Sequence, residues 1–226
     1  MFIHGFEVNF DDAARRTAQL TYDLGYLGAP ILYSWPSTGY FLGYLADETS
    51  IEWTKPHLQE FLAKLAQVER ISKIHIIAHS MGNRALAKIL QSVTRSSGSP
   101  AVNQIVLTAP DIDAGEFLQL ASKFDGSAGR ITLYASSNDH AIKLSKLVHS
   151  YPRAGESGDD IIITAGIDTI DASDVDTSFL GHSYFADRRT VISDLYYLLR
   201  DGKSPNERYS LESRATSKGE YWAFKP

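Results

Sequence analysis

Short apolar runs alternate along the chain with longer segments in which apolar residues recur every three or four positions. Runs rich in β-branched and aromatic residues predict buried strands at residues 2–6, 30–36, 74–78, 102–109, 130–136 and 161–164. The intervening periodicity predicts helices at residues 12–24, 53–69, 85–93, 116–124 and 141–148, with a last helix from residue 183 or 187 to about 199. This alternation predicts an α/β fold, a mostly parallel sheet of about six strands with helices on both faces.

The length of the chain fits one domain with a sizeable core. Residues 1–202 of the 226 are assigned to that domain. After Gly202 the apolar periodicity ends, and residues 203–226 are expected to form a polar C-terminal tail that wraps the surface or is mobile. The stretch at residues 37–52, which holds two glycines and several aromatic residues, is expected to be a loop or a broken helix.

Composition removes several classes of function. The formal net charge is −5, whereas binding of nucleic acid would need a basic stripe, so no nucleic-acid partner is expected. The chain has no cysteine, which excludes disulfides, thiolate metal sites and a cysteine nucleophile, and leaves the compartment open. No apolar run reaches the ~20 residues that cross a bilayer, so no membrane span is expected. The oligomeric state cannot be inferred from the sequence.

One segment joins a predicted strand to a predicted helix through a tight turn. An apolar run ends at Ala78, Ser80 stands in the turn, and a helical pattern follows Gly82. This context is typical of a nucleophile elbow, which lifts a serine hydroxyl above the end of the sheet. The positive end of the following helix favours negative charge near Ser80. The usual pattern has glycine two places before and after the serine, so Ala78 is a mild departure.

Two motifs carry a resemblance to a known family. They are His-Gly-Phe-Glu-Val-Asn-Phe at residues 4–10 and Ala-His-Ser-Met-Gly at residues 78–82. In this order the chain resembles the α/β-hydrolase superfamily, and more closely a bacterial branch of uncharacterised, esterase- or lipase-like members, from about residue 2 to about residue 201. The resemblance implies the α/β-hydrolase fold. Such proteins have one or two strands before the His-Gly segment, so this chain is expected to lack the usual N-terminal strands.

The resemblance also implies a catalytic triad in the order serine, acid, histidine. Ser80 would be the nucleophile, and His182, in the loop before the last helix, would be the base that takes its proton. Asp139 matches the family position of the acid that orients the base. Asp111, which follows the preceding strand, is the alternative acid.

Other ionisable residues are expected to have simpler roles. His140 is adjacent to Asp139 and too close to receive its carboxylate in the usual geometry, and His149 is expected at the surface. Four acidic residues before His182 are expected to form a solvated segment: Asp168, Asp171, Asp174 and Asp176. Their spacing lacks the glycine and the distant glutamate of a calcium loop, so no metal site is expected.

The reaction would need two backbone N–H donors for an oxyanion. The residue after the nucleophile, Met81, supplies one, and the resemblance implies Phe6 as the other, with Gly5 allowing close approach. His4 is expected to hold that loop by hydrogen bonds, and His79 to point away from Ser80. Candidates for an apolar acyl pocket are Tyr33, Trp35, Tyr40, Phe41, Tyr44, Phe179, Tyr184 and Phe185.

These residues predict a serine hydrolase that cleaves carboxylic esters of short or medium acyl chains. No cofactor is required, and a small-molecule ester is the expected partner. A thioesterase, an amidase or an acyltransferase would use the same groups, so these activities remain alternatives. A binding protein that keeps the fold without turnover is the alternative from another class.

Overall fold

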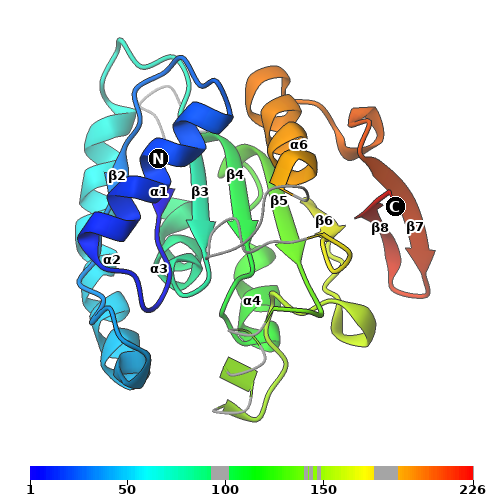
Figure 1. Cartoon of the computed structure of the whole chain (residues 1–226), viewed down its shortest axis with the longest axis horizontal. Helices are drawn as coiled ribbons and strands as arrows, with labels where there is room; N and C mark the ends of the chain where they lie inside the picture. The colour runs from blue at the N-terminus through cyan, green and yellow to red at the C-terminus, as the bar shows by residue number, and fades with distance from the viewer. Residues whose placement is uncertain (93–101, 140–141, 143–144, 147–148, 176–187, 226) are drawn as a thin grey trace.

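The computed structural model describes residues 1–92, 102–139, 142, 145–146, 149–175 and 188–225. Within these residues one eight-stranded sheet has the order β2-β1-β3-β4-β5-β6-β8-β7. All neighbouring strands are parallel except β7 and β8. The predicted α/β fold with a mostly parallel sheet is therefore confirmed, and the sheet is larger than expected (Figure 1).

The elements follow the sequence pattern closely in the centre of the sheet. The strands are β1 Phe2–Ile3, β2 Leu32–Tyr33, β3 His75–His79, β4 Val102–Thr108, β5 Ala128–Ala135, β6 Ile167–Asp171, β7 Leu211–Thr216 and β8 Gly219–Phe224. The α-helices are α1 Phe10–Asp23, α2 Tyr44–Ala66, α3 Gly82–Ile89, α4 Ala114–Ala121 and α6 Arg188–Asp201. Single 3₁₀ turns are η1 Phe41–Gly43, η2 Leu90–Ser92, η3 Gly158–Asp160 and η5 Pro205–Glu207.

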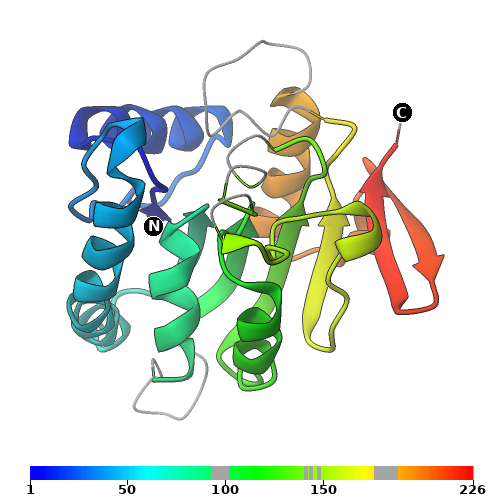
Figure 2. The same ribbon diagram turned by 90° about the horizontal axis from the view of Figure 1, so that it is seen from below.

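Helices cover both faces of the sheet, as Figure 2 shows from below. On β3, Ile76 and Ala78 belong to one buried cluster with α2, α3 and α4, whereas Ile77 belongs to a second cluster with α1 and α6. Successive strand residues point to opposite faces, so a strand buried on both faces is a continuous apolar run. This explains why β3 and β4 were predictable from composition alone.

One of the predicted strands is wrong. The apolar segment at residues 161–164 is not a strand, and β6 lies a few residues later. Ile161 and Ile162 are buried, so their apolar character reflects core packing and not strand pairing. Asp168 and Asp171 consequently lie on β6 instead of in a solvated loop, and the Asp168 carboxylate lies 2.5 Å from Arg130 Nη1 on β5.

The C-terminal residues are part of the fold, which corrects the expectation of a polar tail over residues 203–226. Strands β7 and β8 form an antiparallel hairpin, and β8 pairs in parallel with β6. The buried guanidinium of Arg208 lies 2.8 Å from the buried carboxylate of Asp194 on α6. Tyr134 on β5 donates a hydrogen bond to the same carboxylate. Breaking such a buried pair is costly, so this contact fixes the hairpin against the core.

Buried neutral histidines make the fold sensitive to acid. Burial, helped by the positive charges of the N-terminus and Lys73, lowers the pKa of His75 to about 4. Burial lowers the pKa of His79 to about 3. An unfolded histidine binds a proton near pH ~6.5. Between pH ~6.5 and these folded values the unfolded state binds more protons, so stability is present above that window and is lost as the pH falls through it.

We predict that His75→Gln makes the stability of the protein less dependent on pH. Between pH 6 and pH 4 the free energy of unfolding should fall less steeply than in the wild type, by up to about 1.4 kcal/mol per pH unit for the one proton removed. Urea unfolding at several pH values measures this. His57→Gln, at an exposed position on α2, should keep the wild-type slope. Equal slopes in both variants would contradict the prediction.

Candidate active site

Ser80 stands in a strained turn at the carboxyl end of β3. Its φ is 48°, a left-handed conformation that non-glycine residues rarely adopt. Two further non-glycine residues with positive φ, Glu7 and Ala109, follow β1 and β4 at the same edge of the sheet. Strained backbone of this kind persists where the surroundings fix it and is frequent at functional sites. The predicted strand–turn–helix context of Ser80 is thus present.

Backbone hydrogen bonds hold the turn in place. The Ser80 N–H donates to the carbonyl of Thr108 at 3.0 Å, which ties the turn to β4. The Ser80 carbonyl accepts from the N–H groups of Asn83 at 3.1 Å and Asp111 at 3.2 Å. The elbow is therefore fixed by β4 and by the first residues after it. The Ser80 residue is 5% exposed.

Glycines allow β1 and its loop to approach the elbow. A Cβ on Gly5 would lie 2.9 Å from Ser80 Cβ and 2.8 Å from His79 Nδ1. A Cβ on Gly82 would lie 2.5 Å from the carbonyl oxygen of His4. Both positions therefore require glycine on steric grounds. Ala78, the departure from the usual pattern, is fully buried in the core.

Phe6 and Met81 directly follow the two residues that meet in this close contact, Gly5 and Ser80. Phe6 follows Gly5, and Met81 is the residue before α3. Among the described residues, no hydrogen bond from the N–H of Phe6 or Met81 is present. The ring of Phe6 packs edge-on against Tyr44 at 5.1 Å between centroids and against Phe41 at 6.3 Å. These contacts fix the loop after β1.

His4 has a structural role, as the sequence suggested. Its Nε2 accepts a hydrogen bond from the Trp35 N–H at 3.2 Å, and its carbonyl accepts from the Trp35 indole N–H at 2.7 Å. The two rings stack with centroids 5.1 Å apart. Burial lowers the pKa of His4. His4 therefore joins β1 to the end of β2 as a neutral side chain.

The structure describes Asp139, the predicted acid, but not His182, the predicted base. Asp139 lies beyond the carboxyl end of β5, and its Oδ1 accepts from the N–H of Ile142 at 3.0 Å, as expected for a residue that caps a helix. His182 falls outside the described residues, as do His140 and Asp176. The aromatic candidates at residues 179, 184 and 185 also lie outside them.

Asp111 is the centre of a polar network that sequence reasoning missed. Its buried carboxylate accepts hydrogen bonds from Tyr44 at 2.6 Å, from Ser145, and from the Arg153 Nε at 2.9 Å. Arg84 Nη2 lies 3.2 Å from the same carboxylate. Burial alone would raise the pKa of Asp111, but the guanidinium groups of Arg84 and Arg153 hold it below its usual value.

The network extends to His149, which corrects its expected surface position. The His149 side chain is 26% exposed, and its Nε2 lies 2.8 Å from Glu48 Oε1. Glu48 also accepts from Arg84 at 2.5 Å. A signal was present in the sequence, because Tyr44 and Glu48, and Ser145 and His149, are each four residues apart and so share a helix face.

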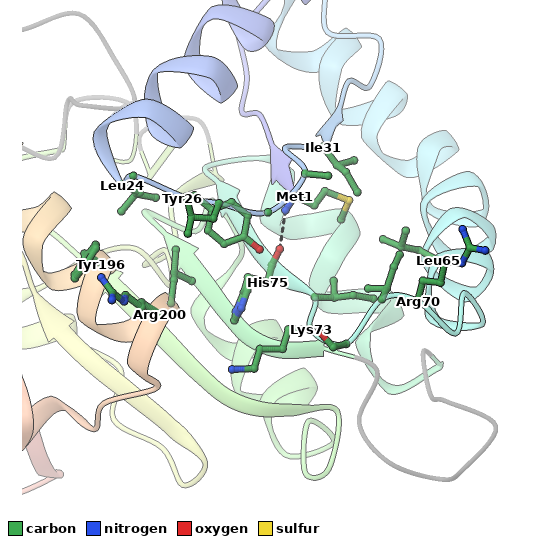
Figure 3. Close-up of a pocket in the computed structure, with 18 residues that line it drawn as sticks. Met1, Leu24, Tyr26, Ile31, Leu65, Arg70, Lys73, His75, Tyr196 and Arg200 are labelled. Carbon is green, nitrogen blue, oxygen red and sulfur yellow. Dashed lines mark hydrogen bonds between the residues drawn. The ribbon is translucent and has the colours of Figure 1, made fainter.

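In the described part of the chain, no group of three or more histidine or acidic side chains could hold a metal ion. No described helix is long and apolar enough to cross a membrane. A cavity of about 520 Å³ lies at the opposite edge of the sheet, where β3 begins, and not beside Ser80 (Figure 3).

Comparison with known proteins identifies the family. Residues 1–200 match the model of a family described as an alpha/beta hydrolase of unknown function (DUF900). The chain belongs to this family. An uncharacterised protein, alr1448, from Nostoc sp. (strain PCC 7120) is 31% identical over 68 residues, which cover 30% of this chain and 18% of that protein. No solved structure matches the chain. Family membership supports a hydrolase in general, without a substrate.

We predict that Gly5→Ala destabilises the protein by about 1–3 kcal/mol, the usual cost of adding a group to a packed interior. The added methyl would meet Ser80 Cβ and His79 Nδ1 at less than van der Waals separation. Gly115→Ala is the matched control, since Gly115 lies in α4 and its new Cβ would meet only the Asp113 side chain, at 3.2 Å. Denaturant unfolding measures both. Equal effects would contradict the close packing of β1 on the elbow.

Proposed function

We propose that this family member is a serine hydrolase that cleaves carboxylic esters. The observation that carries the proposal is Ser80 itself, held at positive φ between β3 and α3, with glycines packed against it. A serine placed in this way presents its hydroxyl at the sheet edge where parallel α/β proteins bind their ligands. Membership of an alpha/beta hydrolase family supports hydrolysis in general.

In the proposed reaction the Ser80 Oγ attacks the ester carbonyl carbon while His182 takes the hydroxyl proton. The carbonyl oxygen becomes an oxyanion, which the N–H groups of Phe6 and Met81 would bind. The intermediate collapses, His182 gives its proton to the leaving alcohol, and an acyl group remains on Ser80. Water then attacks this acyl-enzyme with His182 as the base, releasing the carboxylic acid and restoring Ser80.

Asp139 is the proposed orienting acid, and the contacts of Asp111 support this choice. The two Asp111 oxygens already accept hydrogen bonds from Tyr44, Ser145 and Arg153. A carboxylate that also pairs with the Arg84 guanidinium has little remaining capacity for an imidazole N–H. Asp139, beyond β5, occupies the place that the family resemblance implies for the acid.

The proposed substrate is an ester with a short or medium acyl chain. The ring of Phe6, whose N–H is a proposed oxyanion donor, forms an aromatic cluster with Phe41 and Tyr44, and Phe41 is half exposed. Such a cluster favours an apolar acyl or aryl group. A thioester, an amide or transfer to another acceptor would use the same groups, and a panel of p-nitrophenyl esters and acyl thioesters separates these reactions.

We predict that a fluorophosphonate probe labels Ser80, because activated serines react with phosphorus electrophiles. Mass spectrometry of the labelled peptide identifies the site. Ser80→Ala should lose the label, and His182→Ala should react far more slowly because the hydroxyl would lack its base. Labelling of another serine, or turnover of esters without labelling of Ser80, would remove Ser80 from the mechanism.

We predict opposite phenotypes for the two aspartates. Asp139→Asn should lower kcat by up to ~10⁴-fold with little loss of stability, as expected when an imidazole loses its orienting carboxylate. Asp111→Asn should lower stability by about 3–5 kcal/mol, because Arg84 and Arg153 lose the buried carboxylate that pairs with them.

Ester hydrolysis per folded molecule and urea unfolding, measured on both variants, distinguish the two roles. Tyr44→Phe serves as a milder test of the Asp111 network, since it removes one hydrogen bond to Asp111 and keeps the ring against Phe6. A large loss of kcat in folded Asp111→Asn, with wild-type activity in Asp139→Asn, would assign the acid to Asp111.

A further inference from the structure

The cavity at the amino end of β3 is a second candidate site, separate from Ser80. It has a volume of about 520 Å³ and lies between the segment after α1, the segment before β3, and α6 (Figure 3). Ser80 follows the carboxyl end of the same strand. At ~3.3 Å per residue, the five residues of β3 separate the two sites by roughly 15 Å. The volume lies within the ~300–1,000 Å³ range of small-molecule sites.

The charged side chains that line this cavity are all basic. They are Arg70, Lys73 and Arg200, and none of the described residues that line the cavity is acidic. Among the described residues, Arg70 and Lys73 form no ion pair. The Arg200 guanidinium lies 3.8 Å from Asp201 in an exposed pair and 5.1 Å from the centroid of the Tyr196 ring. In a chain with a net charge of −5, such a concentration of basic side chains favours an anionic ligand.

His75 forms the buried polar part of the wall. The residue is 9% exposed, and its Nδ1 is buried without a hydrogen-bond partner. The rings of Tyr26 and His75 pack edge to face, with centroids 6.2 Å apart. Figure 3 shows Lys73 and Arg200 on the same side of the cavity as His75, and Arg70 on the other side beside Leu65. Because burial lowers its pKa to about 4, the imidazole is a neutral part of this wall beside the two cations.

The rest of the wall is apolar. It includes Leu24, Tyr26, Ile31, Leu65, Tyr196 and Leu199. The backbone nitrogen of Met1 also reaches the wall, where it donates to the His75 carbonyl at 2.7 Å. The positive charge of the cavity comes from the three basic side chains. A ligand must combine a negative group with an apolar body to match both parts.

We propose that this cavity binds a carboxylate carried on an apolar body, of the medium-chain fatty-acid class. The carboxylate would lie between Lys73 and Arg200 near His75, and the hydrocarbon would cover the leucine and tyrosine side chains. Fatty acids satisfy both halves of the wall, whereas a neutral alcohol of the same length lacks the charge. The proposal does not depend on catalysis at Ser80.

Calorimetric titration of Ser80→Ala protein with decanoate, below its micelle concentration, tests the proposal without turnover. Decanoate should bind at least tenfold more tightly than decan-1-ol, and decyltrimethylammonium should not bind. Lys73→Gln and Arg200→Gln should each weaken decanoate binding about tenfold, since each removes a charged partner. Lys123→Gln, at an exposed position outside the cavity, is the matched control and should leave the affinity unchanged.

Equal affinity for decanoate and decan-1-ol, or no effect of Lys73→Gln and Arg200→Gln, would overturn the proposal. The His75 ring resonances in an NMR titration should shift with decanoate and locate the site. A chain with Gly-Ser-Gly added before Met1 should still bind decanoate. Loss of binding in that folded chain would show that polypeptide fills the cavity, which would also overturn the proposal. Esterase activity of Lys73→Gln reports separately on the proposed function and should equal that of the wild type.

Discussion

The left-handed backbone at Ser80 is the constraint on which the arrangement of the candidate site depends. A residue with a side chain adopts φ of 48° only where its surroundings enforce it. Here the enforcement comes from both neighbouring strands. Thr108 on β4 accepts the Ser80 N–H, and the loop after β1 approaches so closely that Gly5 has no room for a Cβ. The parallel pairing of β1, β3 and β4 is thus also what shapes the elbow.

The Asp111 network connects this elbow to more distant segments. The Asp111 N–H binds the Ser80 carbonyl, and the Asp111 carboxylate binds Tyr44, whose ring packs on Phe6. Arg153 joins the segment that follows residue 149 to the same carboxylate. A buried carboxylate with two guanidinium partners holds its neighbours in one geometry, because breaking any part leaves a charge unpaired. One side chain therefore links the turn, the proposed oxyanion loop and the segment beyond β5.

The parts of the fold that could be predicted are those in which local composition and burial agree. β3 and β4 are continuous apolar runs because both faces of the sheet are covered. β6 could not be predicted from its sequence, Ile-Asp-Thr-Ile-Asp, because Asp168 is neutralised by Arg130, a partner on another strand. The C-terminal hairpin could not be predicted because most residues of β7 and β8 are not fully buried. Its attachment to the core depends on the buried Arg208–Asp194 pair, which local sequence does not reveal.

The same reasoning applies to the candidate site. The elbow is local in sequence, so residues 78–82 revealed it, whereas the partners of Asp111 come from four separate segments and could only be found in three dimensions. The spacing of four residues between Tyr44 and Glu48 indicates a shared helix face but not what that face contacts. Sequence therefore located the proposed nucleophile and left its supporting network undetected.

The protonation of the nearby histidines restricts which group can activate Ser80. A general base works best with a pKa near the operating pH. His79 is adjacent to Ser80, but burial lowers its pKa to about 3, so it is a weak base at neutral pH. His4 is neutral as well, but its Nε2 already accepts the Trp35 N–H. Both ring nitrogens of His149 are already engaged, Nε2 with Glu48 at 2.8 Å and Nδ1 with the Ser145 carbonyl at 2.9 Å. Because none of these three is suited to take the Ser80 proton, the base is best sought in another loop, which supports the proposal of His182.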